Sequence, residues 1–256
     1  MRQWTHAHAV LIFALLPAPL DALAEPPSRQ STTAFSNELL DRQYQALLRI
    51  PNRIDVTYTT RGAVRDVFAK NGDTGFKLTG VENLAEGDPA PQVLRDLSDL
   101  LMAVGTEQFT VRTVFDSLPG LRTIALTQSI RGIPVVHGGG LAIEFHQATG
   151  NIRGLSSHFL PDRGLAPAPL ILSSVAAERA KTYVVAQKDS EENSADIVND
   201  PALVYYAGGP ESDAAALVWA VNITYLTRDG GPLSKEVFVN AVTGEVVFEA
   251  ALGSAH

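Results

Sequence analysis

Three histidines within one stretch of the sequence are the first residues to consider as metal ligands. His137, His146 and His158 are separated by 9 and 12 residues, and neither interval matches a local zinc motif. A helical zinc-peptidase site needs His-Glu-x-x-His, and this pattern does not occur in the chain. A metal ion shared between strand ends is one alternative. We favour solvent-facing strand histidines, because histidine is amphipathic and often half-exposed, and we expect no metal site.

The histidine and three glycines at 137–140 match the oxyanion-hole sequence of lipases and esterases. That chemistry also requires a Gly-x-Ser-x-Gly nucleophile elbow at a strand-to-helix turn. The nearest candidate, residues 154–158 (GLSSH), lacks the second glycine and lies among expected strands. We interpret the glycines as a hairpin turn, since glycine supplies the positive φ that tight turns need. A hydrolase built around His137 is the alternative.

The composition excludes several other kinds of site. The chain has 256 residues, 45% of them hydrophobic, which suits a globular protein of one or two domains. It contains no cysteine, so disulfides, thiolate metal sites and cysteine nucleophiles are excluded. Its formal net charge is −8, and we expect no nucleic-acid partner because no basic surface would attract one. Nothing in the sequence calls for a cofactor.

Residues 1–24 have the features of a secretory signal peptide. Arg2 is the one charge near the start, residues 9–16 (AVLIFALL) are apolar, and residues 22–24 (ALA) form a small-x-small cleavage site. The apolar run is too short to span a bilayer. We expect cleavage before Glu25, a secreted or periplasmic protein, and no membrane attachment afterwards. A buried N-terminal helix is the alternative.

Periodicity in residues 25–162 predicts two helices and an antiparallel sheet. Helices are expected at 37–49 and from Pro89 to a glycine cap at Gly105, and strands at 54–58 and 109–115. Residues 123–159 contain four extended runs joined by glycine turns, and Ile143 and Phe145 alternate with polar neighbours. This alternation predicts an antiparallel meander with one packed face and one solvated face.

The pattern restarts after a proline-rich linker at residues 163–171. A helix is expected from about residue 173 to 187, followed by strands at 202–206, 216–226, 236–242 and 245–250. The fold class predicted for the whole chain is therefore α+β. We expect two domains, each an antiparallel sheet with one or two packed helices.

Two sets of residues carry a family resemblance. Residues 128–136 (QSIRGIPVV), 139–141 (GGL), 150–152 (GNI), 155–157 (LSS) and 160–162 (LPD) resemble the fungalysin/thermolysin propeptide (FTP) domain. Residues 216–221 (ALVWAV) and 237–246 (VFVNAVTGEV) resemble the PepSY domain, which usually has aspartate where this chain has Asn240. The resemblance implies an FTP-like domain at 25–162 and a PepSY-like domain with a C-terminal tail at 172–256.

This resemblance implies a function without catalysis. FTP and PepSY domains precede thermolysin-like zinc metalloproteases, keep them silent and assist their folding, but the catalytic motif is missing here. The protein is thus expected not to be an enzyme. It resembles a free-standing propeptide, whose expected partner is a thermolysin-like metalloprotease that it inhibits in trans and whose folding it assists. A non-inhibitory exported binding or structural module that reuses both domains is the alternative.

The C-terminal residues are the candidate inhibitory segment that this resemblance implies. In linked propeptides, the chain that leaves PepSY runs toward the protease, and thermolysin-like enzymes favour a bulky apolar residue after the scissile bond. Leu252 is the only such residue after the last expected strand. The segment consists of Ala251, Leu252, Gly253, Ser254, Ala255 and His256. A terminus without a fixed structure is the alternative.

Overall fold

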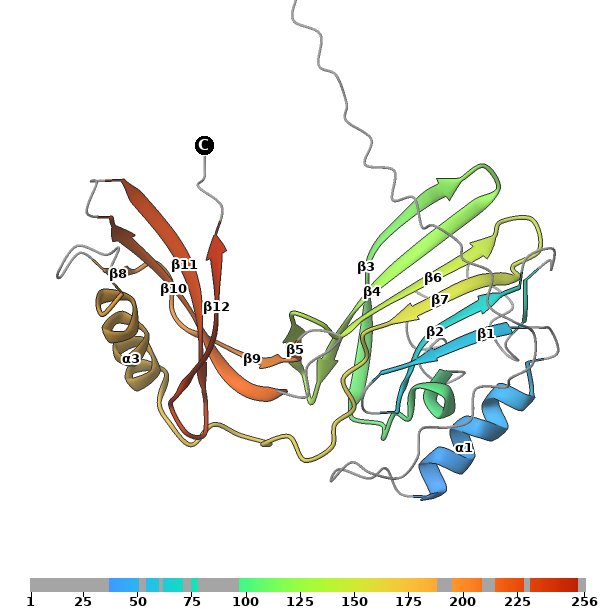
Figure 1. Ribbon diagram of the computed structural model, residues 1–256, viewed down its shortest axis with the longest axis horizontal. Helices are drawn as coiled ribbons and strands as arrows, with labels where there is room; N and C mark the ends of the chain where they lie inside the picture. Colours follow the sequence, from blue (N-terminus) through green and yellow to red (C-terminus); the bar gives the residue numbers. More distant parts are fainter. Residues whose placement is uncertain are drawn as a thin grey trace, which may run out of the picture.

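The structure is a computed structural model that describes residues 37–50, 54–59, 62–70, 75–77, 97–187, 195–208, 215–227 and 231–252. The described chain is mostly β-sheet with few helices, which is consistent with an α+β fold. Figure 1 shows two sheets that lean away from each other and meet near β5 and β9. The expected signal peptide lies outside the described residues. Within the described ranges, no helix has the length and apolar character required to cross a membrane.

The first half of the chain contains one helix and a set of antiparallel strands at positions close to those that its periodicity predicts. Its elements are α1 (Asn37–Leu48), β1 (Ile54–Tyr58), β2 (Val64–Ala69), β3 (Glu107–Leu118), β4 (Leu121–Ile130), β5 (Ile133–Val136), β6 (Gly140–His146) and β7 (Ile152–Ser157). Ile124 and Leu126 of β4, and Ile143 and Phe145 of β6, are buried in one core, while their strand neighbours point to the other face. The predicted alternation is confirmed.

The second predicted helix ends earlier than expected. Residues 97–101 are helical, and the start of that helix lies outside the described residues. Met102 adopts a left-handed φ of 57°, and the amide of Ala103 donates to the Ser98 carbonyl at 2.8 Å. The helix therefore closes at Met102, and Gly105 (φ 97°) serves the turn that follows.

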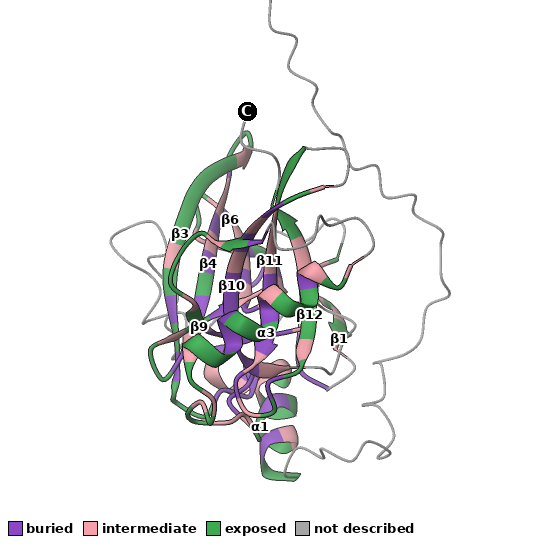
Figure 2. Cartoon of the chain, turned by 90° about the vertical axis from the view of Figure 1, so that its left-hand side faces the viewer, coloured by how far each residue is buried: buried purple, intermediate pink, exposed green. Residues whose placement is uncertain are grey.

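The second half contains one helix that packs on one face of a sheet. Its elements are α3 (Ser173–Val185), β8 (Asp196–Ile197), β9 (Ala202–Tyr206), β10 (Ala216–Leu226), β11 (Pro232–Asn240) and β12 (Val246–Leu252). Ala176 and Ala180 allow α3 to approach the sheet closely, and both are fully buried against Val221, Ile223 and Val239. Figure 2 shows this buried centre of β10 and β11 behind the exposed outer side of α3.

A short parallel strand pair joins the two sheets. Val135 and Val136 of β5 lie opposite Tyr205 and Tyr206 of β9, and this pair completes a strand order of β1-β2-β7-β6-β4-β5-β9-β10-β11-β12. β3 pairs with β4, and β8 pairs with β10. The expectation that each half is a separate antiparallel sheet is therefore wrong at this point. A division into domains at the 163–171 linker stays a prediction, because buried side chains from both halves share a cluster around Leu160 and Tyr205.

The meander also departs from the expected hairpins. Arg131 and Gly132 do form the turn between β4 and β5. The glycines at 138–140, by contrast, do not join two paired strands, because both β5 and β6 pair with β4. Ser129 pairs with Pro134 and Thr127 pairs with Gly140, so residues 135–139 leave the ladder with β4 and return to it. This excursion carries Val135 and Val136 to β9.

Candidate functional site

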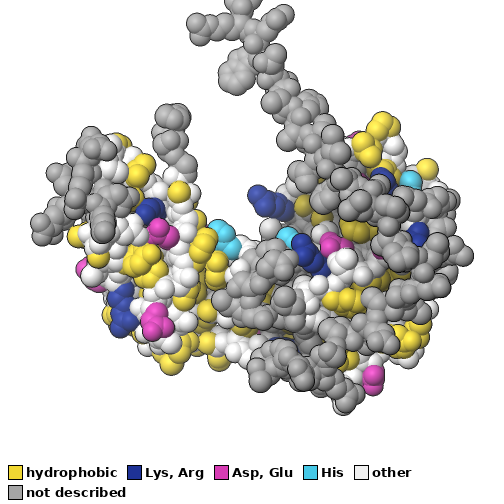
Figure 3. Space-filling view, in the orientation of Figure 1, with side chains coloured by type: hydrophobic (Ala, Val, Ile, Leu, Met, Phe, Trp, Pro, Cys, Tyr) yellow, Lys and Arg dark blue, Asp and Glu magenta, His cyan; other side chains and the backbone are white. Residues whose placement is uncertain are grey.

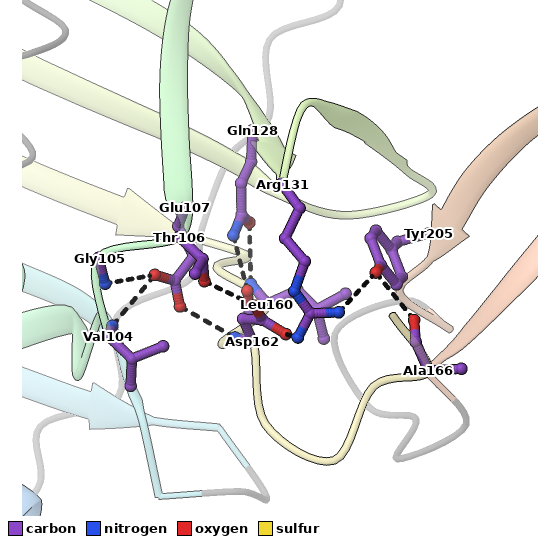
Figure 4. A network of polar contacts seen from close by, with 10 residues as sticks. All are labelled: Val104, Gly105, Thr106, Glu107, Gln128, Arg131, Leu160, Asp162, Ala166 and Tyr205. Carbon is purple, nitrogen blue, oxygen red and sulfur yellow. Dashed lines mark hydrogen bonds and ion pairs between the residues drawn. The ribbon is translucent and has the colours of Figure 1, made fainter. Parts of the chain in front are cut away.

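A buried polar network lies where the two halves meet (Figure 4). Glu107, at the start of β3, is 1% exposed. Its carboxylate accepts hydrogen bonds from the amides of Val104, Gly105 and Asp162 at 3.0, 2.9 and 2.9 Å. Gln128 accepts from the Leu160 amide and donates to the Leu160 carbonyl. These contacts fix the segment that leaves β7 against β3 and β4.

Asp162 extends the network to the second half. Its side chain is 2% exposed, accepts from the Thr106 hydroxyl at 2.6 Å, and forms an ion pair with Arg131. Arg131 also donates to the Tyr205 hydroxyl of β9 at 3.2 Å, and that hydroxyl donates to the Ala166 carbonyl at 2.9 Å. Burial raises the pKa of Tyr205, and the charge of Arg131 opposes this rise. Each of these groups has a partner, so the network acts as a clamp between the halves rather than as a reactive site.

The second sheet has a face that no helix of the described chain covers. Side chains alternate along its strands, and those turned away from α3 include Val204, Tyr206, Val218, Ala220 and Phe238, which pack together. Figure 1 places α3 on the opposite side of this sheet from the first half. The uncovered face, which we call the open face, therefore looks toward the first half. Figure 3 shows the hollow between the halves and hydrophobic side chains on the wall that the second half forms.

Four rings form an aromatic cluster on the open face. The ring of His137 lies 5.7 Å from Tyr206, 5.1 Å from Phe238 and 5.2 Å from Phe248, measured between centroids. Phe238 is buried, whereas Phe248 is 37% exposed and His137 is exposed. Burial raises the pKa of the Tyr206 hydroxyl. The cluster thus presents a ring edge and an imidazole to solvent on a base of packed aromatic side chains.

The excursion between β5 and β6 places His137 in this cluster. His137 has a φ of 52°, and Gly139 has a φ of 67°. A Cβ atom on Gly139 would lie 2.5 Å from Cβ of Val135, and one on Gly138 would lie 2.6 Å from Cβ of Ala207. The amide of Gly139 donates to the His158 carbonyl at 2.7 Å, so it is not free to stabilise an oxyanion. Gly138 and Gly139 therefore allow the backbone to lie close to the side chains of Ala207 and Val135, and they do not form the expected hairpin turn.

The edge strand β12 continues the cluster along the open face. Phe248, Ala250 and Leu252 share this face, and Leu252 is 37% exposed. β12 was expected to end at Ala250 but includes Ala251 and Leu252, which pair with Lys235 and Ser234 of β11. Leu252 is therefore not beyond the last strand. Gly253, Ser254, Ala255 and His256 lie outside the described residues.

The remaining predicted residues do not converge on a common site. His146 ends β6, and His158 follows β7 with its backbone bonded to Gly139 and Gly140. Within the described ranges, no three His, Cys, Asp or Glu residues are grouped so that they could hold a metal ion. Asn240 accepts from the amides of Val242 and Thr243 at 2.9 and 3.0 Å, a turn role that its amide oxygen fulfils without a carboxylate.

Comparisons with known proteins add little to this geometry. Neither the family models nor the curated proteins that were compared give a match. Among solved structures, the chain is similar to the Bacillus megaterium YpeB C-terminal domain, with 12% sequence identity and a TM-score of 0.30. The similarity covers 86% of this chain and 99% of that chain. Because identity and TM-score are both low, this similarity supports no argument about function.

Proposed function

We propose that the protein is an exported inhibitor of a thermolysin-like zinc metalloprotease, that it acts in trans, and that it also assists folding of that protease. The family resemblance of the sequence motivates this choice of partner. The observation that supports it in the structure is the half-exposed aromatic cluster on the open face, beside an edge strand. An inhibitor or folding assistant needs such a protein-binding surface and no catalytic group of its own.

The aromatic cluster has the properties of an interface centre. Aromatic side chains dominate binding energies because they bury large areas at low entropic cost. Phe248 and His137 offer that area, and their positions are held by the buried Tyr206 and Phe238. Phe248 is 37% exposed, so partner contact would bury about a third of its surface and contribute about 0.5–1 kcal/mol of the roughly 1.5–3 kcal/mol that full burial of such a side chain contributes.

The C-terminal segment 251–256 is the second part of the proposal. A substrate-like position in the protease cleft would use Leu252 as the apolar anchor and would place the terminal residues near the zinc ion. Because Ala251 and Leu252 pair with β11, this position requires either that the cleft approaches β12 itself or that the end of β12 detaches. Inhibition by coverage of the cleft with the open face is the alternative.

Inhibition of peptide hydrolysis is the direct test. Purified protein without residues 1–24 is titrated into a thermolysin-like protease, and the inhibition constant is measured with a small fluorogenic peptide. Phe248→Asp should weaken inhibition by about tenfold or more, which corresponds to about 1.4 kcal/mol. Tyr44→Asp is the matched control, because Tyr44 is 51% exposed but lies on α1, away from the open face. A wild-type protein without effect on any such protease would refute the proposal.

A non-inhibitory binding module is the second candidate. The apolar and aromatic character of the open face favours a protein partner, and these properties alone do not require a protease. Stable complex formation in gel filtration without loss of protease activity would favour this candidate.

A further inference from the structure

The hydrogen-bond pattern of β11 shows which backbone groups of β12 point outward, away from the sheet. The amide of Asn240 donates toward the β12 side, to the Glu245 carbonyl, and the amide of Ala241 donates to Leu217 of β10. Backbone groups alternate in direction along a strand. Even-numbered residues of β11 therefore face β12, where Glu236 pairs with Ala250 and Ser234 pairs with Leu252.

This alternation assigns the two sides of β12. The backbone groups of Ala250 and Leu252 point toward β11, so those of Glu249 and Ala251 point away from the sheet. β12 ends the strand order, and no strand in the described part of the chain pairs with its outer side. Two amides and two carbonyls of β12 thus have no strand partner among the described residues and form an edge open to pairing.

The other edges of the sheet are less suited to pairing. β8 has only two residues. β3 has register shifts at two places, and such irregularities interrupt pairing. β1 carries the exposed Asp55 with its ion pair to Lys70. In β12, the register shift precedes Phe248, and the stretch from Phe248 to Leu252 pairs without interruption.

The side chains beside this edge define a complementary sequence. Phe248 and Leu252 lie on the open face and are each 37% exposed. Glu249 points to the opposite face, where its 33% exposed carboxylate forms an ion pair with Lys235 at 3.3 Å and accepts from the Gln187 amide at 2.7 Å. The described residues between 172 and 252 include six acidic side chains and three basic ones, namely Glu178, Asp196, Asp200, Glu236, Glu245 and Glu249 against Arg179, Lys181 and Lys235. An incoming strand therefore fits best with apolar residues toward the open face and a basic residue opposite Glu249.

We propose that β12 binds an extended segment of the partner protein as an added strand, and that this segment alternates apolar and basic residues. The identification of that partner as a protease rests on the proposed function, but the edge and its preference do not. Main-chain hydrogen bonds to Glu249 and Ala251 hold the segment, and contacts with Phe248 and Leu252 select its side chains. A second copy of this chain is a poorer occupant, because its own acidic half would face the same acidic half.

The test uses a synthetic peptide as the probe. The peptide has seven residues, carries fluorescein, and has leucine at every second position with lysine or threonine between the leucines. It is titrated with the full protein, and fluorescence anisotropy gives the Kd of the complex. A peptide of the same sequence with N-methylated amides on its pairing side should bind at least about tenfold more weakly, equivalent to about 1.4 kcal/mol. Replacement of lysine by glutamate should also weaken binding, more so at low salt. Equal affinity of the N-methylated and unmodified peptides, or no binding of either, would overturn the proposal.

Two variants of one residue test the edge in the protein. Ala251→Pro removes an outward amide and leaves the bonds to β11 intact, since Ala251 is exposed and its amide faces away from the sheet. Ala251→Val retains that amide, and valine is similar in size to the proline of the first variant. We expect Ala251→Pro to weaken peptide binding by at least about tenfold and Ala251→Val to keep it within about threefold. Unchanged binding by Ala251→Pro would overturn the proposal, as would a wild-type dimer in sedimentation that Ala251→Pro dissociates.

The same variants separate this inference from the proposed function. Peptide binding that depends on Ala251, without inhibition of any thermolysin-like protease, would support the edge and refute the inhibitor. Protease inhibition that Ala251→Pro leaves unchanged, together with absent peptide binding, would support the inhibitor and refute the edge.

Discussion

Loss of the Asp162 carboxylate should weaken the clamp between the two halves. In Asp162→Asn, the amide oxygen can still accept from the Thr106 hydroxyl, but the amide nitrogen then faces the guanidinium of Arg131. The variant loses a charge-assisted hydrogen bond, which is worth about 1.5–3 kcal/mol. Removal of one partner from a fully buried ion pair costs about 3–5 kcal/mol. Arg131 is 33% exposed and can turn to water, so we expect about 2 kcal/mol.

Urea unfolding and calorimetry measure this loss. About 2 kcal/mol corresponds to a fall in Tm of about 4–8 °C for a chain of this size. Arg122→Gln is the control, because the Arg122–Asp116 pair is 35% and 61% exposed and such pairs contribute about 0–1 kcal/mol. A double-mutant cycle with Arg131→Gln should give a coupling energy of about 1 kcal/mol or more. The clamp interpretation is refuted if Asp162→Asn costs no more than Arg122→Gln.

Four further changes test separate parts of the molecule. Glu107→Gln should lower the free energy of unfolding by about 1–3 kcal/mol, because its amide nitrogen would face a buried backbone donor; urea unfolding checks this value. Gly139→Ala should destabilise the fold, because its Cβ would lie 2.5 Å from Cβ of Val135 at a φ of 67°; the Tm would fall, and an unchanged Tm would contradict the geometry. Tyr205 has a pKa raised by burial, so the unfolded chain loses its phenol proton first and stability should decrease as pH rises above about 10; Tyr205→Phe should reduce that decrease in alkaline melts. Leu252→Asp should weaken protease inhibition by about tenfold or more without a large change in Tm, and an unchanged inhibition constant would exclude Leu252 as an anchor.

Local patterns in the sequence predicted the individual strands and turns correctly where one face of the element is buried in the core. The alternation of Ile143 and Phe145 with polar residues placed β6 correctly, since one face of the strand is buried. The position of α1 along the chain and the Arg131-Gly132 turn were also assigned correctly. The buried face of α1 was not, because it contains Gln43 whereas Tyr44 and Leu48 are exposed. The correctly assigned features depend on residues within a few positions of each other, which is why periodicity and turn chemistry suffice.

Features that join distant segments were not predictable in this way. The parallel pair of β5 with β9 brings together Val135 and Tyr205, and it depends on the shared burial of both halves around them. From the sequence alone, Glu107 is expected to face solvent. In the structure it is a buried acceptor, because the turn at residues 104–105 directs two backbone amides to its carboxylate. Phe238 and Phe248 lie in recognisable strands, but His137 and Tyr206 complete their cluster from segments far away in sequence.

The Tyr205-Tyr206 dipeptide connects the clamp to the open face. Because successive side chains of a strand point to opposite faces, Tyr205 reaches Arg131 and Ala166 while Tyr206 packs with Phe238 and His137. Both backbones are held by the β5 excursion that the glycines permit. A weakened clamp should therefore also loosen the aromatic base beneath Phe248. If the open face is the interface, Asp162→Asn should reduce partner binding although Asp162 lies in the clamp and not on that face. Binding unaffected by Asp162→Asn at a temperature well below its Tm would show that the face keeps its shape without the clamp.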